Sequence, residues 1–174
     1  MKPNKINKMI YMSLLVGMAL ILFIIEGMIP MPFITPGAKL GLANLVIMIA
    51  VYTLGSYKEA FTVLFLRLLL STMLGGSIST LMYSAAGGIL SFIIIIIVKE
   101  LGGKYVSIIG VSAAAAVFHN IGQLMVASLI LKNIGVFLYL PILSIAGIGT
   151  GIFVGISANY LLSHLNKISY LKFS

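Results

Sequence analysis

The sequence contains no cysteine, no tryptophan and no aspartate, and only three of its 174 residues are acidic. Without cysteine, the chain can form neither a disulfide bond nor a thiolate metal site. Three acids and two histidines are too few to favour a protein-built metal site, so we predict no metal and no cofactor. The missing aspartates argue against magnesium-dependent diphosphate chemistry, and no Walker loop for ATP is present. We therefore predict that the protein is not an enzyme.

Charged residues of both signs are scarce, and apolar residues take their place. Charged residues make up 8% of the chain and hydrophobic residues 61%, with a mean hydropathy of +1.20. Soluble domains have about 45–50% apolar and about 25% charged residues. The composition predicts a polytopic all-α membrane protein, in contact with membrane lipid. Because apolar stretches fill nearly the whole chain, we expect a single membrane domain over residues 1–174.

Glycine, serine and lysine interrupt the apolar stretches at intervals that predict six membrane helices. The expected helices cover residues 9–29, 40–54, 59–74, 78–98, 105–131 and 134–162. The first apolar stretch continues without a small-residue cleavage site, so we interpret it as a retained helix. The third would measure about 24 Å, less than the hydrocarbon core of about 30 Å. We expect the short second and third helices to lie among longer neighbours.

The net charge of +8 comes from lysines that stand singly or in pairs between the apolar stretches. This pattern indicates membrane orientation and argues against a nucleic-acid partner. With both termini in the cytoplasm, the inner segments hold eight lysines and the outer segments hold only Lys39 and Lys132. The positive-inside rule therefore predicts a multi-pass protein of the cell membrane with N- and C-termini in the cytoplasm.

Two charged residues fall inside predicted membrane helices. Glu26 lies near the outer end of the first helix, and either reaches the interface or pairs with a cation inside the bundle. Arg67, the only arginine, lies near the middle of the third helix, where facing lipid would cost about 2.5–3.5 kcal/mol. Arg67 must therefore face protein or water. Either an ion pair with Glu26 or a bound anion would suit its guanidinium group.

A second polar group lies in the fifth predicted helix. His119 and Gln123 are four residues apart and share one helical face, with Asn120 next to His119. Such a cluster at membrane depth either lines a ligand cavity or forms hydrogen bonds between helices. Asn44 is a weaker candidate of the same kind. In the first helix, Ser13 and Gly17 would allow close approach of a partner subunit, or ordinary helix packing.

The stretches PFITPGAKLGLAN, LRLLLSTMLGG, YSAAGGILSF and FHNIGQL resemble a family of small membrane proteins. This family is called heptaprenyl diphosphate synthase component I, or the Gx transporter family. Its members are similar to the substrate-binding S components of energy-coupling factor (ECF) transporters. The resemblance implies a six-helix S-component-like fold with a ligand pocket near the outer face. The residues that it implies for ligand binding are Lys39, Asn44, Arg67, His119, Asn120 and Gln123, below a lid loop with Pro36, Gly37 and Gly41.

The leading hypothesis is a substrate-capture subunit that binds a small molecule, an anion among the candidates, from outside. By resemblance, a transmembrane coupling protein and ATPases would supply the energy, and Ser13 and Gly17 would dock this partner. The alternative is a membrane accessory protein in polyprenyl diphosphate or quinone synthesis. A third hypothesis is a structural subunit of a larger complex, whose polar cluster serves only to join helices.

Overall fold

The computed structural model describes residues 5–28, 41–74, 77–103 and 105–165, and this part of the chain is entirely helical. It contains six α-helices and one 3₁₀-helix. Their bounds are α1 Lys5–Met28, α2 Asn44–Thr53, α3 Tyr57–Met73, α4 Ile78–Gly102, α5 Ile108–Leu131, η1 Ile134–Tyr139 and α6 Leu140–Leu165. The number and order of the α-helices agree with the sequence prediction.

The helix ends differ from the prediction where charged residues or turns meet the apolar stretches. α1 and α4 continue into their lysine-containing ends, because helices do not stop where hydrophobicity stops. The second helix begins at Asn44 and not at residue 40, since Gly41 has a φ of +88° and its carbonyl accepts the amide of Asn44 in a turn. The start of the predicted sixth helix is the 3₁₀-helix η1.

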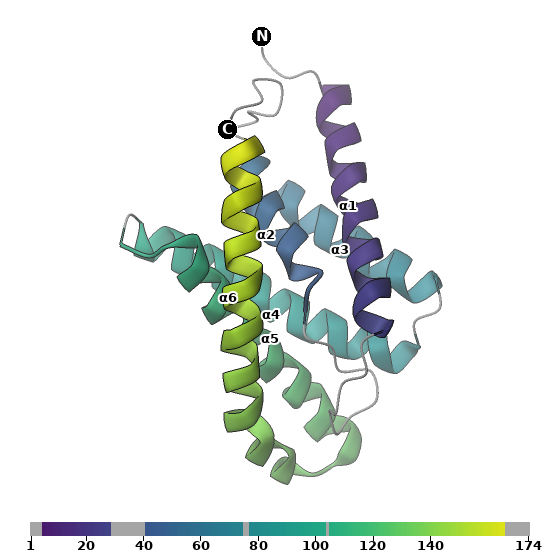
Figure 1. The fold of residues 1–174 in the computed structure, drawn as a ribbon. Helices are drawn as coiled ribbons and strands as arrows, with labels where there is room; N and C mark the ends of the chain where they lie inside the picture. Colours follow the sequence, from purple (N-terminus) through teal and green to yellow (C-terminus); the bar gives the residue numbers. More distant parts are fainter. Residues whose placement is uncertain (1–4, 29–40, 75–76, 104, 166–174) are drawn as a thin grey trace.

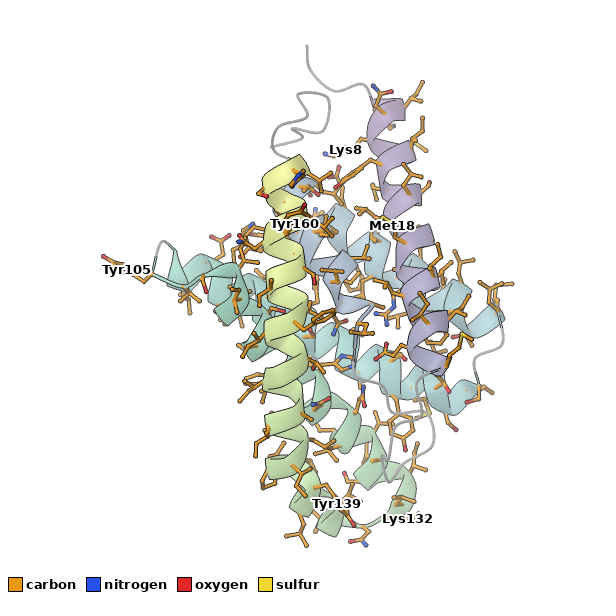
Figure 2. All side chains as sticks on the ribbon, in the orientation of Figure 1. Lys8, Met18, Tyr105, Lys132, Tyr139 and Tyr160 are labelled. Atoms are coloured by element: carbon orange, nitrogen blue, oxygen red, sulfur yellow. The ribbon has the colours of Figure 1, made fainter. Side chains whose placement is uncertain are left out.

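α1 and α6 run along the length of the bundle, and α4 crosses it obliquely (Figure 1). α5 packs most extensively against α4 and α6. The beginning of α1 and the end of α6 lie at the same end of the molecule. Lys8 and Tyr160 lie toward this end, whereas Lys132 and Tyr139 lie at the opposite end (Figure 2).

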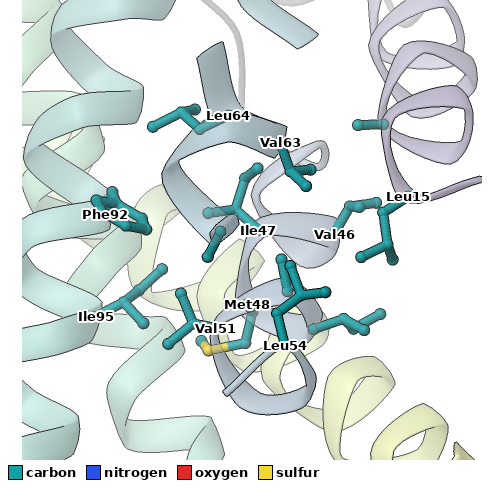
Figure 3. Close-up of a cluster of buried hydrophobic side chains, with 14 of the residues drawn as sticks. Leu15, Val46, Ile47, Met48, Val51, Leu54, Val63, Leu64, Phe92 and Ile95 are labelled. Atoms are coloured by element: carbon teal, nitrogen blue, oxygen red, sulfur yellow. The ribbon is translucent and has the colours of Figure 1, made fainter. Parts of the chain in front are cut away.

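α2 forms the centre of the hydrophobic core. Nearly all of its residues are buried, as expected for a helix that is apolar on every side. Ile47, Met48 and Val51 contact side chains of α1, α3 and α4 in one apolar cluster (Figure 3). This cluster confirms that the short second helix lies among longer neighbours.

α3 has one buried stripe and one exposed face. Its buried residues recur at spacings of three and four, which places them on one side of a helix; they are Ala60, Val63, Leu64, Arg67, Leu68 and Ser71. The exposed residues between them include Phe61, Phe65 and Leu69. Exposed apolar side chains of this kind suit contact with lipid.

Glycines allow α4, α5 and α6 to approach closely. A Cβ atom at Gly151 of α6 would lie 2.6 Å from Cα of Ala113 in α5, and one at Gly155 would lie 2.6 Å from Cα of Ile109. On the other side of α5, a Cβ at Gly122 would lie 2.7 Å from the carbonyl oxygen of Ala86 in α4. The three helices therefore pack backbone to backbone.

Polar contacts join the helices at the end of the bundle where α1 begins. Lys8 of α1 forms an ion pair with Glu59 of α3, with 2.7 Å between Nζ and Oε2. The Tyr57 hydroxyl donates a hydrogen bond to Glu100 of α4. Lys99 donates to the carbonyl of Val51 at 3.2 Å and lies over the rings of Tyr52 and Tyr57.

Four helical segments are long and apolar enough to cross a membrane: Lys5–Met28, Ile78–Gly102, Ile108–Leu131 and Ile134–Leu165. α2 is a shorter apolar helix. The chain thus has the helices of a multi-pass membrane protein, with two shorter helices packed among the longer ones.

Candidate functional site

Arg67 lies on the buried stripe of α3, between Leu64 and Leu68, and is 2% exposed. Its side chain points toward α4, where a Cβ atom at Gly88 would lie 3.9 Å from Nη1. Within the described residues, neither Nε nor Nη1 has a hydrogen-bond acceptor. Since a buried donor without an acceptor costs about 1–3 kcal/mol, and more when charged, this side chain is suited to a ligand that supplies one.

Glu26 faces the interior from α1 and is 2% exposed, so its carboxylate does not reach the interface. It accepts a hydrogen bond from the backbone N–H of Gly41, just before α2. Its charge interacts with that of Arg67, but the described residues show no direct ion pair between the two side chains. The carboxylate therefore joins the end of α1 to the start of α2.

His119 is 2% exposed, and both of its ring nitrogens contact amide side chains. Nε2 lies 2.6 Å from Nε2 of Gln123, and Nδ1 lies 3.2 Å from Nδ2 of Asn44. A neutral imidazole donates from one nitrogen and accepts at the other, and an amide group can serve either role. The histidine thus fixes the positions of Asn44 from α2 and Gln123 from α5.

Glycines on two other segments enclose the His119 ring. A Cβ atom at Gly41 would lie 3.2 Å from Cδ2 and Nε2, and one at Gly87 of α4 would lie 2.8 Å from Cε1 and Nδ1. Any larger residue at Gly87 would therefore displace the ring. A glycine pair in the middle of a helix, Gly87–Gly88, is the sequence signal that a side chain approaches closely here.

Asn120 lies outside the cluster that contains His119. Its amide donates to the carbonyl oxygen of Leu143 in α6 at 2.7 Å. The same nitrogen would lie 2.7 Å from a Cβ atom at Gly147. Asn120 therefore joins α5 to α6, which is the helix-bridging role that the sequence left open.

The remaining predicted residues are Lys39 and those of the lid loop and of the partner-docking face. Lys39, Pro36 and Gly37 lie outside the described residues. Ser13 is on the exposed side of α1, where its hydroxyl donates to the carbonyl of Met9 at 3.0 Å. A Cβ atom at Gly17 would have no neighbour within 4 Å, so this helix face is open.

The site therefore combines a buried arginine, a buried carboxylate and three hydrogen-bonding side chains contributed by four helices. Arg67 supplies positive charge and two nitrogens that have no acceptor among the described residues, which is chemistry for holding an anion. No group of three metal-binding side chains occurs in the described part of the chain.

The sequence pattern of the family described as heptaprenyl diphosphate synthase component I matches residues 15–161. No curated protein and no solved structure matches the chain. The match extends from α1 to α6 and includes every described candidate for ligand binding.

Proposed function

The chain belongs to the heptaprenyl diphosphate synthase component I family. From this we propose that it is a membrane-embedded, non-catalytic subunit with an S-component-like fold that captures a small anionic molecule. Arg67 carries the proposal, because it is buried and two of its nitrogens have no acceptor in the described part of the chain. The anion would accept hydrogen bonds from Arg67, with Asn44 and Gln123, held by His119, beside it.

The end of the bundle that holds Lys8 is proposed to face the cytoplasm, and the end that holds Lys132 to face outward. The lysine distribution in the sequence supports this orientation, and so does the position of both lysines at opposite ends (Figure 2). Ligand would then enter from outside, with Lys39, Pro36 and Gly37 in the lid. A separate energising module would dock on the open face of α1 at Ser13 and Gly17.

A second candidate function is supported by the family description. An accessory subunit of a polyprenyl diphosphate synthase would present its membrane site to a prenyl diphosphate and would associate with a catalytic partner. The same arginine would then bind the diphosphate group. The two functions differ in the molecule that is bound and in the partner.

Mass spectrometry of small molecules that co-purify in mild detergent distinguishes these functions. The test variant is Arg67→Met, which keeps an apolar volume in the core. Because it removes the cation whose charge interacts with buried Glu26, its folding is checked by thermal unfolding before the small molecules are compared. The matched control is Lys132→Ala, which removes an exposed cation at the C-terminal end of α5. Loss of about 1.5–3 kcal/mol of charge-assisted hydrogen bonding lowers affinity about ten- to a hundredfold.

We expect the wild type and Lys132→Ala to retain a water-soluble anion that Arg67→Met loses. A prenyl diphosphate lost in the same way would favour the accessory function. Retention of the same compound by folded Arg67→Met, or the presence of bulk lipid alone in the wild type, would contradict the proposed anion site.

A further inference from the structure

Four helices each contribute one polar side chain to a cavity inside the bundle. The cavity has a volume of about 10 Å³, which is at the lower end of the about 10–15 Å³ that a cavity needs to hold one water molecule. Its polar lining consists of Asn44 from α2, Ser91 from α4, Ser112 from α5 and Thr150 from α6. Met48, in the core cluster of Figure 3, also lines it. A small space with polar groups on several sides is a site for an ordered molecule.

The two serines at this cavity differ from most other hydroxyl groups in the protein. The usual pattern is a hydrogen bond to a backbone carbonyl three or four residues earlier, made by Ser13, Thr53, Thr62, Ser71, Thr72, Ser128, Thr150, Ser157 and Ser163. Ser91 and Ser112 are 1% and 3% exposed; Ser91 Oγ accepts from Asn44, and neither hydroxyl forms a hydrogen bond to a backbone carbonyl of its own helix in the described residues. Within the described part of the chain, the cavity that both residues line is where their protons can find an acceptor.

The other two polar groups can accept hydrogen bonds. The Thr150 hydroxyl donates its own proton to the carbonyl of Gly147 at 3.1 Å, which leaves its oxygen able to accept. The Asn44 amide nitrogen lies 3.4 Å from Ser91 Oγ and 3.2 Å from His119 Nδ1. With its nitrogen donating to these two atoms, the Asn44 side chain presents its oxygen as an acceptor for the cavity that it lines.

We propose that the cavity binds one structural water molecule that joins α2, α4, α5 and α6. The water accepts from the hydroxyls of Ser91 and Ser112, and donates to Thr150 Oγ and to the Asn44 oxygen. These are the two donors and two acceptors that complete the hydrogen bonds of a water molecule.

A metal cation fits the same site less well. A cation cannot accept the two serine protons, which would then stay buried without acceptors. The lining also contains no carboxylate to offset the cost of burying a positive charge. Water satisfies the groups present, and a cation does not.

The water cavity adjoins the candidate functional site, because Asn44 is part of the site and also lines the cavity. Asn44 contacts His119 on one side and lines the cavity on the other. The bound water therefore holds the start of α2 against the rigid group of α4, α5 and α6. The water would be bound whether or not Arg67 holds an anion.

Radiolytic hydroxyl-radical labelling of the full chain in detergent tests the proposal. Radicals formed from a bound water oxidise adjacent side chains, and Met48 is reactive, 1% exposed and part of the lining. We expect rapid oxidation of Met48 in the wild type despite its burial. Ser112→Val places a methyl group in the cavity and should abolish that oxidation, whereas exposed Met125 should be labelled equally in both proteins.

The matched control is Ser71→Val, the same change at a serine that is 3% exposed and lies outside the cavity. Thr150→Val provides a second test that keeps the side-chain shape and removes one water partner, so Met48 oxidation should fall there too. The proposal is overturned if wild-type Met48 is not oxidised, or if both cavity variants leave its oxidation unchanged. Sodium-dependent thermal stabilisation without Met48 oxidation would assign the site to a cation and would also overturn it.

Discussion

Tyr57, the first residue of α3, lies outside the membrane span predicted for residues 59–74 and contacts a charged partner. Its hydroxyl donates to Glu100, and this hydrogen bond raises the pKa of Tyr57 to about 12, with smaller effects from burial and from repulsion by the carboxylate. The folded protein thus favours the protonated phenol. The resulting stabilisation is present below pH 10, the usual tyrosine pKa, and is lost as the pH rises toward 12.

Titration of tyrosinate by ultraviolet absorbance checks this shift. The difference between the wild type and Tyr57→Phe isolates Tyr57, and we expect its midpoint near pH 12. Glu100→Gln should lower the midpoint toward 10, because the negative acceptor is gone. A Tyr57 midpoint near 10 in the wild type would show that the contact with Glu100 is absent in solution.

At the residue scale, the sequence predicted which polar groups are inward but not all of their partners. The cost of exposing Arg67 to lipid required a buried position, and helical spacing placed Gln123 beside His119. The contact of His119 with Asn44 crosses from α5 to α2, and no local spacing encodes it. Asn120 follows His119 directly, so the helix turns it about 100° away, toward α6.

At the scale of whole elements, the tight pairing of α5 and α6 depends on particular glycines of α6. Gly151→Ala would place Cβ 2.6 Å from Cα of Ala113 and 2.9 Å from the carbonyl oxygen of Ser112. Backbone atoms cannot move aside as a side chain can, so the helices must separate. We expect a loss of about 1–3 kcal/mol.

Gly149→Ala is the matched control, because a Cβ atom there has no neighbour within 4 Å. Alanine is favoured over glycine within a helix by about 0.5–1 kcal/mol, so this variant should be as stable as the wild type or more so. Thermal unfolding followed by circular dichroism in detergent compares the two, with a shift of about 2–4 °C for each kcal/mol. Equal unfolding temperatures would show that α5 and α6 do not pack as described.

The elements themselves were largely predictable, because long apolar stretches and their interruptions mark membrane helices directly. What could not be predicted were features that depend on geometry beyond hydrophobicity. The turn at Gly41 delays the start of α2, and the chain begins its last helical segment as η1. Composition does not distinguish a 3₁₀ turn from the first turn of an α-helix in such an apolar stretch.

At the scale of the whole molecule, the absence of cysteine makes the proposed orientation directly testable. Single variants Lys5→Cys and Lys132→Cys place one thiol at either end of the bundle, each at an exposed position. In intact cells, a membrane-impermeant maleimide should label Lys132→Cys, whereas Lys5→Cys should react only after lysis. The unmodified chain provides the unlabelled control, and the reverse pattern would invert the topology.

The short, largely buried α2 also has a consequence for how the protein is made. Its ten residues extend about 15 Å, half the hydrocarbon thickness, so it cannot span the bilayer on its own. Its neighbours include α6, which is synthesised after α1 to α5. We therefore expect α2 to stay shielded by the insertion machinery until α6 has been synthesised and can pack against it.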